Sequence, residues 1–420
     1  MEMIHTMEFV HSATIYSCSW NEAGDHLLTC SADGTANLIS VKDDSIKIVQ
    51  SWNVAGKLNG GKEAKVPLGA MQMGCAFLQG NIPVTVSLNG SIAILSLTSP
   101  SKFQFLTGHQ SPISSMAIDQ VKGIMYTGDS DGVICSWDVA TGNSIQNVQR
   151  SENTHTDEGF DDTLMNKVHA GAITGMTFSS TGKLLSIGWD DKLRMTKSFT
   201  AEGSTKLDSQ PNSIAKGTDL VVIMTVNGLL LAKDDAIISD LIATSYEPMS
   251  VCVSSDDKLV FVGGKDCSIY VYSVNDTSLD KINTLTGVHL QPVYALSLSN
   301  DGTKLASADV RDICVWNVSE SGSCNTIIGK GRWCFHSQKV NVITWSSDGS
   351  ILASGGNDDS IFLWSLKKPS TRVQYAFAHR DGITDMMFLN GVDGLILASV
   401  GNDGCVNKWD VTDDVMKKFG

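Results

Sequence analysis

A quartet of polar and aromatic residues recurs about every 40 residues along the chain and restricts what it can fold into. In the stretch HSQKVNVITWSSDGSILASGGNDDSIFLWSL, a histidine precedes an alternating strand and a serine ends the next strand. An aspartate follows four residues after that serine, and a tryptophan ten residues after it. Three copies fill every position: His336, Ser354, Asp358 and Trp364; His109, Thr127, Asp131 and Trp137; and His379, Ser399, Asp403 and Trp409.

Other copies keep only part of the quartet, and nine copies are counted in all. They begin near residues 11, 71, 109, 169, 210, 247, 289, 336 and 379. The partial sets are His169, Ser186 and Asp190, with Thr196 at the tryptophan position; His289 and Trp316; His11 and Asp33, with Ile39 at the tryptophan position; and Asp266 and Tyr272.

Each copy alternates apolar and polar residues over short runs bounded by Gly, Asp and Ser, which is the pattern of β-strands. One small sheet cannot bury both of its faces, whereas sheets packed around an axis can. Three copies end in SWDV, KWDV and VWNV, variants of the WD signature. We therefore predict an all-β fold with a seven-bladed WD-repeat β-propeller over residues 101–420. Residues 1–100 hold two additional blades of an incomplete N-terminal propeller.

Closure of the predicted ring needs one more strand, because the chain stops soon after the third strand of the last copy. The segment KFQFL (residues 102–106) is one candidate for this outer strand. If KFQFL instead completes the copy that precedes it, HTMEFV (residues 5–10) is the next candidate. An outer edge left unpaired would invite association with another chain.

The quartet contains Ser, His and Asp, which are also the members of a hydrolase triad. A triad requires an exposed serine on a strained turn and an oxyanion hole, and the chain has no GxSxG motif. We expect the quartets to be internal networks in which buried polar groups satisfy one another. We therefore predict no enzyme activity and no catalytic residue.

Metal and cofactor sites are also not predicted. Cys314, Cys324 and Cys334 lie ten residues apart, whereas zinc ligands come as closer pairs. The DSDG sequence at Asp129 resembles the start of a calcium loop, but Ala140 stands where the bidentate glutamate is needed. Glycine-rich phosphate loops are absent, so no cofactor is expected.

The net charge of −14 and the lack of a basic cluster argue against binding to nucleic acid or to an anionic membrane. No apolar run is long enough to span a bilayer, and the first residues do not resemble a secretory signal. The ten cysteines mostly lie inside apolar runs without a CxxC pair, which favours reduced thiols and a cytoplasmic location.

Propellers usually bind partners through the loops around their central channel. The residue before each turn aspartate is expected there, and the candidate partner-binding residues are Trp189, Lys265, Asn357 and Asn402. Trp189 is the most informative of these, because tryptophan is enriched in binding hot spots. Its alternative role is local packing on the adjacent blade.

The order of well-formed and degenerate copies resembles that of the actin-interacting WD-repeat family. The resemblance depends most on VVIMTVNGLLLAKD, on VSLNGSIAILSL followed by FLTGHQSPI, and on WSSDGSILASGGNDDSIFLWSL followed by AHRDGITDMMF. It implies two joined seven-bladed propellers, of which this chain keeps the last two blades of the first and all of the second. It further implies a cytoplasmic protein of the actin cytoskeleton, with actin filaments and cofilin as partners, that promotes cofilin-dependent filament disassembly. Since the family's main actin-contacting surface lies largely on the first propeller, the resemblance transfers no actin-contact residue.

An alternative function is a generic WD-repeat scaffold, or a substrate receptor in a multiprotein complex such as a ubiquitin ligase. Such receptors often carry Trp-Asp-x-Arg after a blade, whereas the corresponding sites in this chain read WDVA, WNVS, WSLK and WDVT.

Overall fold

The computed structural model describes residues 10–42, 45–54, 71–78, 82–87, 92–97, 103–106, 109, 111–119, 121–139, 144–150, 167–197, 199–389 and 394–420. Most of the HTMEFV segment lies outside these residues. The chain divides into two compact units, residues 1–108 and 109–420, and each is treated by itself. The described residues form β-strands and one α-helix.

The described part of unit 1 contains two four-stranded antiparallel sheets. Sheet A consists of β1 (Ile15–Trp20), β2 (His26–Ser31), β3 (Thr35–Lys42) and β4 (Ser45–Asn53). Sheet B consists of β5 (Gln72–Leu78), β6 (Ile82–Ser87), β7 (Ile92–Leu95) and β8 (Phe103–Leu106). Because β8 pairs with β7, KFQFL completes the preceding copy and does not provide the outer strand of the last one. The boundary between the units accordingly follows this strand and does not lie near residue 100.

The described part of unit 2 contains seven sheets, which are numbered in chain order. Sheet 1 is β9 (Ile113–Asp119), β10 (Ile124–Asp129), β11 (Ile134–Asp138) and β12 (Ser144–Asn147). Sheet 2 is β14 (Ile173–Phe178), β15 (Leu184–Gly188), β16 (Lys192–Lys197) and β17 (Thr200–Lys206), with β13 (Gln149–Arg150) parallel to β17. Sheet 3 is β18 (Pro211–Lys216), β19 (Val221–Thr225), β20 (Gly228–Lys233), β21 (Ala236–Ile237) and β22 (Ile242–Ala243).

Sheet 4 is β23 (Pro248–Val253), β24 (Leu259–Gly264), β25 (Ile269–Asn275) and β26 (Ser278–Leu285). Sheet 5 is β27 (Ala295–Leu298), β28 (Lys304–Ala308), β29 (Ile313–Val318) and β30 (Cys324–Trp333). Sheet 6 is β31 (Val340–Trp345), β32 (Ile351–Gly356), β33 (Ile361–Ser365) and β34 (Arg372–Tyr375). Sheet 7 is β35 (Ile383–Leu389), β36 (Ile396–Gly401) and β37 (Val406–Asp410).

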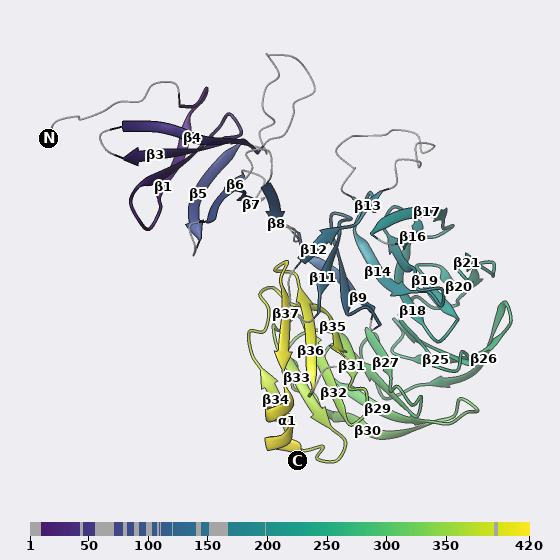
Figure 1. The fold of residues 1–420 in the computed structure, drawn as a ribbon. Coiled ribbons are helices and arrows are strands. Elements are labelled where there is room, and N and C mark those ends of the chain that lie inside the picture. Colours follow the sequence, from purple (N-terminus) through teal and green to yellow (C-terminus); the bar gives the residue numbers. More distant parts are fainter. Residues whose placement is uncertain are drawn as a thin grey trace. The chain divides into compact units, whose positions relative to one another are not determined.

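The sheets of unit 2 surround a common axis, as Figure 1 shows, and the first strand of each contacts the first strand of the next. Strand β35 of the last sheet contacts β9 of the first, so the series closes. A polar side chain on the inner strand often donates a hydrogen bond to a carbonyl of the following sheet. The donors and acceptors are Ser114 and Ile173, Thr174 and Pro211, Ser250 and Val293, Asn341 and Ile383, and Thr384 and Ile113. This is a β-propeller, as predicted.

Sheet 7 has no fourth strand among the described residues, and helix α1 (Thr412–Phe419) follows its third strand. The helix has acidic residues in its first turn and lysines in its last, which suits the helix dipole. Val415 and Phe419 are buried in the cluster that also contains Val373 of sheet 6 and Leu397 of sheet 7. The C-terminal segment therefore packs as a helix where the sequence suggested only an unfinished sheet.

Apolar contacts between neighbouring sheets form the core of unit 2. Between sheets 5 and 6, the rings of Trp333 and Trp364 stack with their centroids 5.1 Å apart, and both side chains are buried. Burying such side chains stabilises the fold by about 2–3 kcal/mol each. Because every sheet uses both faces in this way, the ends of the sheets remain free to carry exposed loops and turns.

Candidate functional site

The quartet of sheet 6 forms one continuous hydrogen-bonded network. His336 Nδ1 lies 3.0 Å from a carboxylate oxygen of Asp358, and His336 Nε2 lies 2.8 Å from Ser354 Oγ. The indole N–H of Trp364 donates to the same hydroxyl oxygen at 2.9 Å. A neutral histidine that carries its proton on Nδ1 satisfies every group, because Ser354 can then donate to Nε2 while it accepts from Trp364.

Burial separates this network from a catalytic triad. Ser354 is 0% exposed, and His336 and Trp364 are each 1% exposed. A substrate cannot approach the serine hydroxyl, because the hydroxyl is buried and is contacted by the histidine and the indole. The network therefore holds the loop before the first strand to the middle strands of the sheet.

Four other sheets of unit 2 contain a related network. In sheet 7, His379 lies 3.0 Å from Asp403 and 2.7 Å from Ser399, to which Trp409 donates at 2.8 Å. The corresponding sets are His289, Asp309, Ser307 and Trp316 in sheet 5; His169, Asp190 and Ser186 in sheet 2; and His109, Thr127 and Trp137 in sheet 1. In sheet 2 the hydroxyl of Thr196, at the tryptophan position, is buried with no hydrogen-bond partner within the described residues.

The prediction that Asp131 is the network aspartate of sheet 1 is wrong. His109 Nδ1 contacts Asp129 at 2.8 Å, whereas Asp131 accepts a hydrogen bond from Ser111 at the surface. Asp129 also accepts the backbone N–H groups of Asp131 and Val133, both at 2.9 Å. The turn thus brings Asp129, which follows Thr127 by two residues, into contact with the histidine. In sheet 5, Asp309 also follows the network serine, Ser307, by two residues.

Five of the network aspartates have a lowered pKa, which favours their charged form. Burial alone would raise the pKa of Asp190, but the hydrogen bond and charge of His169, the N–H of Ala170 and the nearby Arg194 lower the pKa to about 2. Against the effect of burial, the hydroxyl of Thr35, the N–H groups of Ser12 and Thr35, and His11 lower the pKa of Asp33. Histidine and backbone N–H groups likewise lower the pKa of the carboxyl in Asp309, Asp358 and Asp403.

Two sheets of unit 2 replace the histidine network. In sheet 4, Tyr246 stacks on Tyr270 with ring centroids 3.7 Å apart and shares a 2.8 Å hydrogen bond with the hydroxyl of Tyr272. The hydroxyl of Tyr270 donates to Asp266 at 2.6 Å. In sheet 3, the buried Ile223 stands at the serine position, so no polar group there needs a partner.

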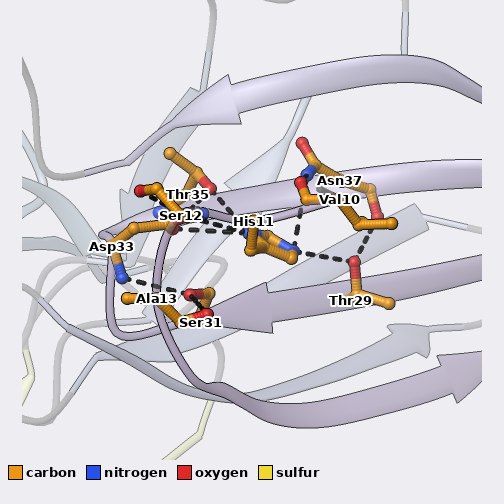
Figure 2. A network of polar contacts seen from close by, with 9 residues as sticks. All are labelled: Val10, His11, Ser12, Ala13, Thr29, Ser31, Asp33, Thr35 and Asn37. Atoms are coloured by element: carbon orange, nitrogen blue, oxygen red, sulfur yellow. Dashed lines mark hydrogen bonds and ion pairs between the residues drawn. The ribbon is translucent and has the colours of Figure 1, made fainter. Parts of the chain in front are cut away.

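Sheet A of unit 1 has its own network, shown in Figure 2. His11 Nε2 lies 2.9 Å from the hydroxyl of Thr29, and His11 Nδ1 lies 3.2 Å from Asp33 and 2.9 Å from Thr35. Asn37 donates to the carbonyl of Val10 and so fixes the loop before the histidine. Polar groups from the loop, the turn and the strands thus replace the missing tryptophan.

The predicted partner-binding residues lie at equivalent turns of four sheets in unit 2. In each, the backbone N–H donates to a carbonyl of the loop that enters the same sheet. The pairs are Trp189 with Ala172 at 2.9 Å, Lys265 with Glu247 at 2.9 Å, Asn357 with Lys339 at 2.9 Å, and Asn402 with Gly382 at 3.1 Å. We call the end of unit 2 that carries these turns the rim.

The side chains of these four residues differ in how they are held. Lys265 pairs with Glu247 at 2.7 Å, Asn357 accepts from Asn341 at 2.6 Å, and Asn402 donates to the carbonyl of Asp381 at 2.6 Å. Trp189 is 60% exposed. Packing on the adjacent sheet therefore does not bury Trp189, which remains the strongest of the four candidates for a partner contact.

Three further exposed apolar residues lie in rim segments and were not anticipated from the sequence. Val226 donates its N–H to Gln210 in sheet 3, as Trp189 does to Ala172 in sheet 2, and it is 41% exposed. Leu290 follows the network residue His289, and Phe377 precedes His379 by two residues. The positions of Leu290 and Phe377 beside network histidines are a signal that could have identified them.

A channel runs along the axis of unit 2 and has a volume of about 400 Å³. Every sheet contributes residues of its first strand to the lining, including Ser115, Thr174, Asn212 and Asn341. Asp385 also lines it, accepts the N–H of Met116 at 2.8 Å, and has a pKa that burial raises to about 7. This carboxyl joins the last sheet to the first.

Neither a metal-binding cluster nor a membrane-spanning helix is present among the described residues. No group of three or more His, Cys, Asp or Glu side chains within that part of the chain is placed to hold a metal ion. Across the same residues, no helix has the length and apolar character needed to cross a membrane.

The WD domain, G-beta repeat family matches residues 2–40, 100–138, 241–273 and 330–365. The chain therefore contains WD repeats in these four segments. It is 31% identical to the "66 kDa stress protein" of Physarum polycephalum over 388 residues, which cover 90% of this chain and 58% of that relative.

Two other relatives carry more informative names. "WD repeat-containing protein 1" of Xenopus tropicalis is 29% identical over 96% of this chain and 61% of its own length. "Actin-interacting protein 1" of Drosophila melanogaster is 28% identical over 90% of this chain and 58% of its own length. The resemblance to actin-interacting WD-repeat proteins is thereby confirmed, although the chain spans only about three-fifths of these curated relatives.

Proposed function

We propose that this WD-repeat protein binds actin filaments and promotes their cofilin-dependent disassembly without catalysing a reaction. The observation that carries the proposal is the similarity to relatives named "Actin-interacting protein 1" along 90% of the chain in Drosophila melanogaster and 76% of it in Caenorhabditis elegans, where "interacting" describes those proteins. The burial of Ser354 and the equivalent hydroxyls supports a binding role, because the quartets then serve the fold. This function fits a cytoplasmic protein of the actin cytoskeleton.

We also propose that residues 1–108 are part of a first propeller and that residues 109–420 form a second, seven-bladed one. Apolar side chains remain exposed on both sheets of unit 1, as with Trp20 on β1 and Ile82 on β6. In a full ring, neighbouring sheets would cover such side chains, since interior blades pack on both faces.

The rim is the proposed contact surface of unit 2, with Trp189 as its principal anchor. Trp189 lies beside Asp190, whose carboxylate is fixed by His169, so the turn is rigid before a partner arrives. A rigid aromatic side chain loses little conformational entropy on binding, which favours its use as an anchor.

Co-sedimentation with actin filaments, with and without bound cofilin, tests the proposal. We expect the chain to pellet with cofilin-decorated filaments and to increase their severing, and Trp189→Ala to weaken pelleting by about tenfold or more. Val121→Ala is the matched control, because Val121 is 97% exposed in the turn after β9, at the opposite end of sheet 1 from the rim.

A chain that neither pellets nor changes severing would refute the actin proposal. Pelleting that Trp189→Ala and Val121→Ala weaken equally would refute the rim as the contact surface. Recovery of ubiquitin-ligase adaptor subunits without actin from a pull-down would instead support a substrate receptor.

A further inference from the structure

Three cysteines of unit 1 lie close together where sheets A and B meet. Cys18 is on β1 and Cys30 on β2, where Cys30 is directly opposite Ser17 in the strand register. Cys75 enters from β5 of the other sheet, with its Sγ 3.4 Å from the carbonyl oxygen of Leu28 and 3.7 Å from Ser17 Oγ. Because Cys30 and Ser17 are register partners, their side chains lie on the same face of sheet A, and the Cys75 thiol approaches that face at Ser17.

The thiols of Cys30 and Cys75 have unequal surroundings. Interaction with the neighbouring Cys30 thiol, followed by the hydrogen bond with Ser17, lowers the pKa of Cys75 despite its partial burial. The same contact and complete burial raise the pKa of Cys30, which is 0% exposed. Cys75 is therefore the thiol that ionises first and is reached more easily, and Cys30 is a protected neighbour.

We propose that Cys30 and Cys75 form an oxidation site at which hydroperoxides create a disulfide between sheets A and B. The Cys75 thiolate attacks one peroxide oxygen, the O–O bond breaks, and Cys75 becomes a sulfenic acid while hydroxide or alkoxide leaves. The Cys30 sulfur then attacks the Cys75 sulfur and releases water as the S–S bond forms. Two thiols are oxidised by two electrons in total, and one peroxide is reduced.

The other cysteines lack this combination. Burial raises the pKa of Cys314 to about 12, so it reacts slowly with peroxide although it too lies in a strand. Cys405 is an exposed residue. Its pKa is nevertheless raised, by partial desolvation of the sulfur and by the charge of Asp403. Cys405 therefore controls for exposure alone, and Cys314 controls for burial alone.

Peptide mapping of the full chain tests the proposal. The reduced protein is treated with hydrogen peroxide, its remaining thiols are alkylated, and the digest is analysed by mass spectrometry. We expect a Cys30–Cys75 peptide pair that has lost two hydrogen atoms and separates again with dithiothreitol. We also expect Cys75 to react about tenfold faster than Cys405, and Cys314 to remain alkylated.

Variants separate the two steps of the reaction. In Cys30→Ser, a dione probe of sulfenic acids should label Cys75, because no resolving thiol remains. In Cys75→Ser, neither the probe adduct nor the bridge should form, and Cys314→Ser should leave the bridge intact. A bridge to Cys18, or oxidation of Cys75 no faster than that of Cys405, would overturn the proposal. Mapping of the unsubstituted chain decides this even where a variant fails to fold.

Discussion

The two aspartates in the first turn of unit 2 allow a direct test of how the quartets work. Asp129 is 2% exposed and accepts three hydrogen bonds, from His109 Nδ1 at 2.8 Å and from the N–H groups of Asp131 and Val133. Asp131 accepts one hydrogen bond, at the surface, from Ser111. The two residues have the same chemistry and are two positions apart, so each is the natural control for the other.

We expect Asp129→Ala to lower the free energy of unfolding by about 2–3 kcal/mol. Removing the carboxylate leaves the buried N–H of His109 without an acceptor, which costs about 1–3 kcal/mol, and the two turn amides lose a charged partner. Asp131→Ala should cost about 0.5 kcal/mol or less, as substitutions of exposed residues usually do.

Urea unfolding followed by tryptophan fluorescence measures both variants, since Trp137 belongs to the same network. Equal losses in the two variants, or a larger loss for Asp131→Ala, would mean that spacing along the sequence identifies the network aspartate better than the turn geometry does. Turn geometry would then not explain the networks of sheets 1 and 5.

Three further perturbations test other parts of unit 2. Burial raises the pKa of Asp385 to about 7, well above its value of 3.8 in an unfolded chain, so the wild type should lose stability as pH rises between these values. Asp385→Asn, which keeps an oxygen for Met116, should remove that loss, as thermal unfolding at pH 4 and pH 8 would reveal. Thr196→Val should raise the free energy of unfolding by about 1 kcal/mol in urea titrations, because it removes a buried hydroxyl without a partner in the described structure. Phe419→Ala should cost about 3 kcal/mol and speed amide hydrogen exchange in α1, while the exposed Met416→Ala should change neither.

The repeat spacing predicts the fold class well, because sheet packing depends on alternation and on turns that recur at regular intervals. The networks of His336 and His379 follow directly from that spacing. Asp131 illustrates the limit, since the shape of the turn and not the residue count decides which carboxylate lies under the histidine. Tyr246 shows a second limit, because its partner Tyr272 lies on a strand that only the folded sheet brings near.

The C-terminal segment could not be predicted for a different reason. The sequence VTDDVMKKFG follows the WD dipeptide of the last copy, and nothing in it distinguishes an unpaired tail from a docked helix. Val415 and Phe419 are four residues apart and lie on one helical face, but the surface they bury is made by Val373 and Leu397 of two different sheets. Tyr375 then donates to Asp414 at 2.6 Å, and this contact also requires the folded neighbour.

The networks and the rim are physically coupled, because they share the same turns. Asp190 is held by His169 and by the N–H of Ala170, and the preceding residue, Trp189, is tied by its own N–H to Ala172. A partner that contacts the Trp189 indole therefore meets a side chain whose backbone is fixed on both sides. Val226 presents a smaller apolar side chain from the same turn position in the next sheet, where no polar network is needed. The buried quartets thus fix the backbone beside the exposed residues that we propose as the contact surface.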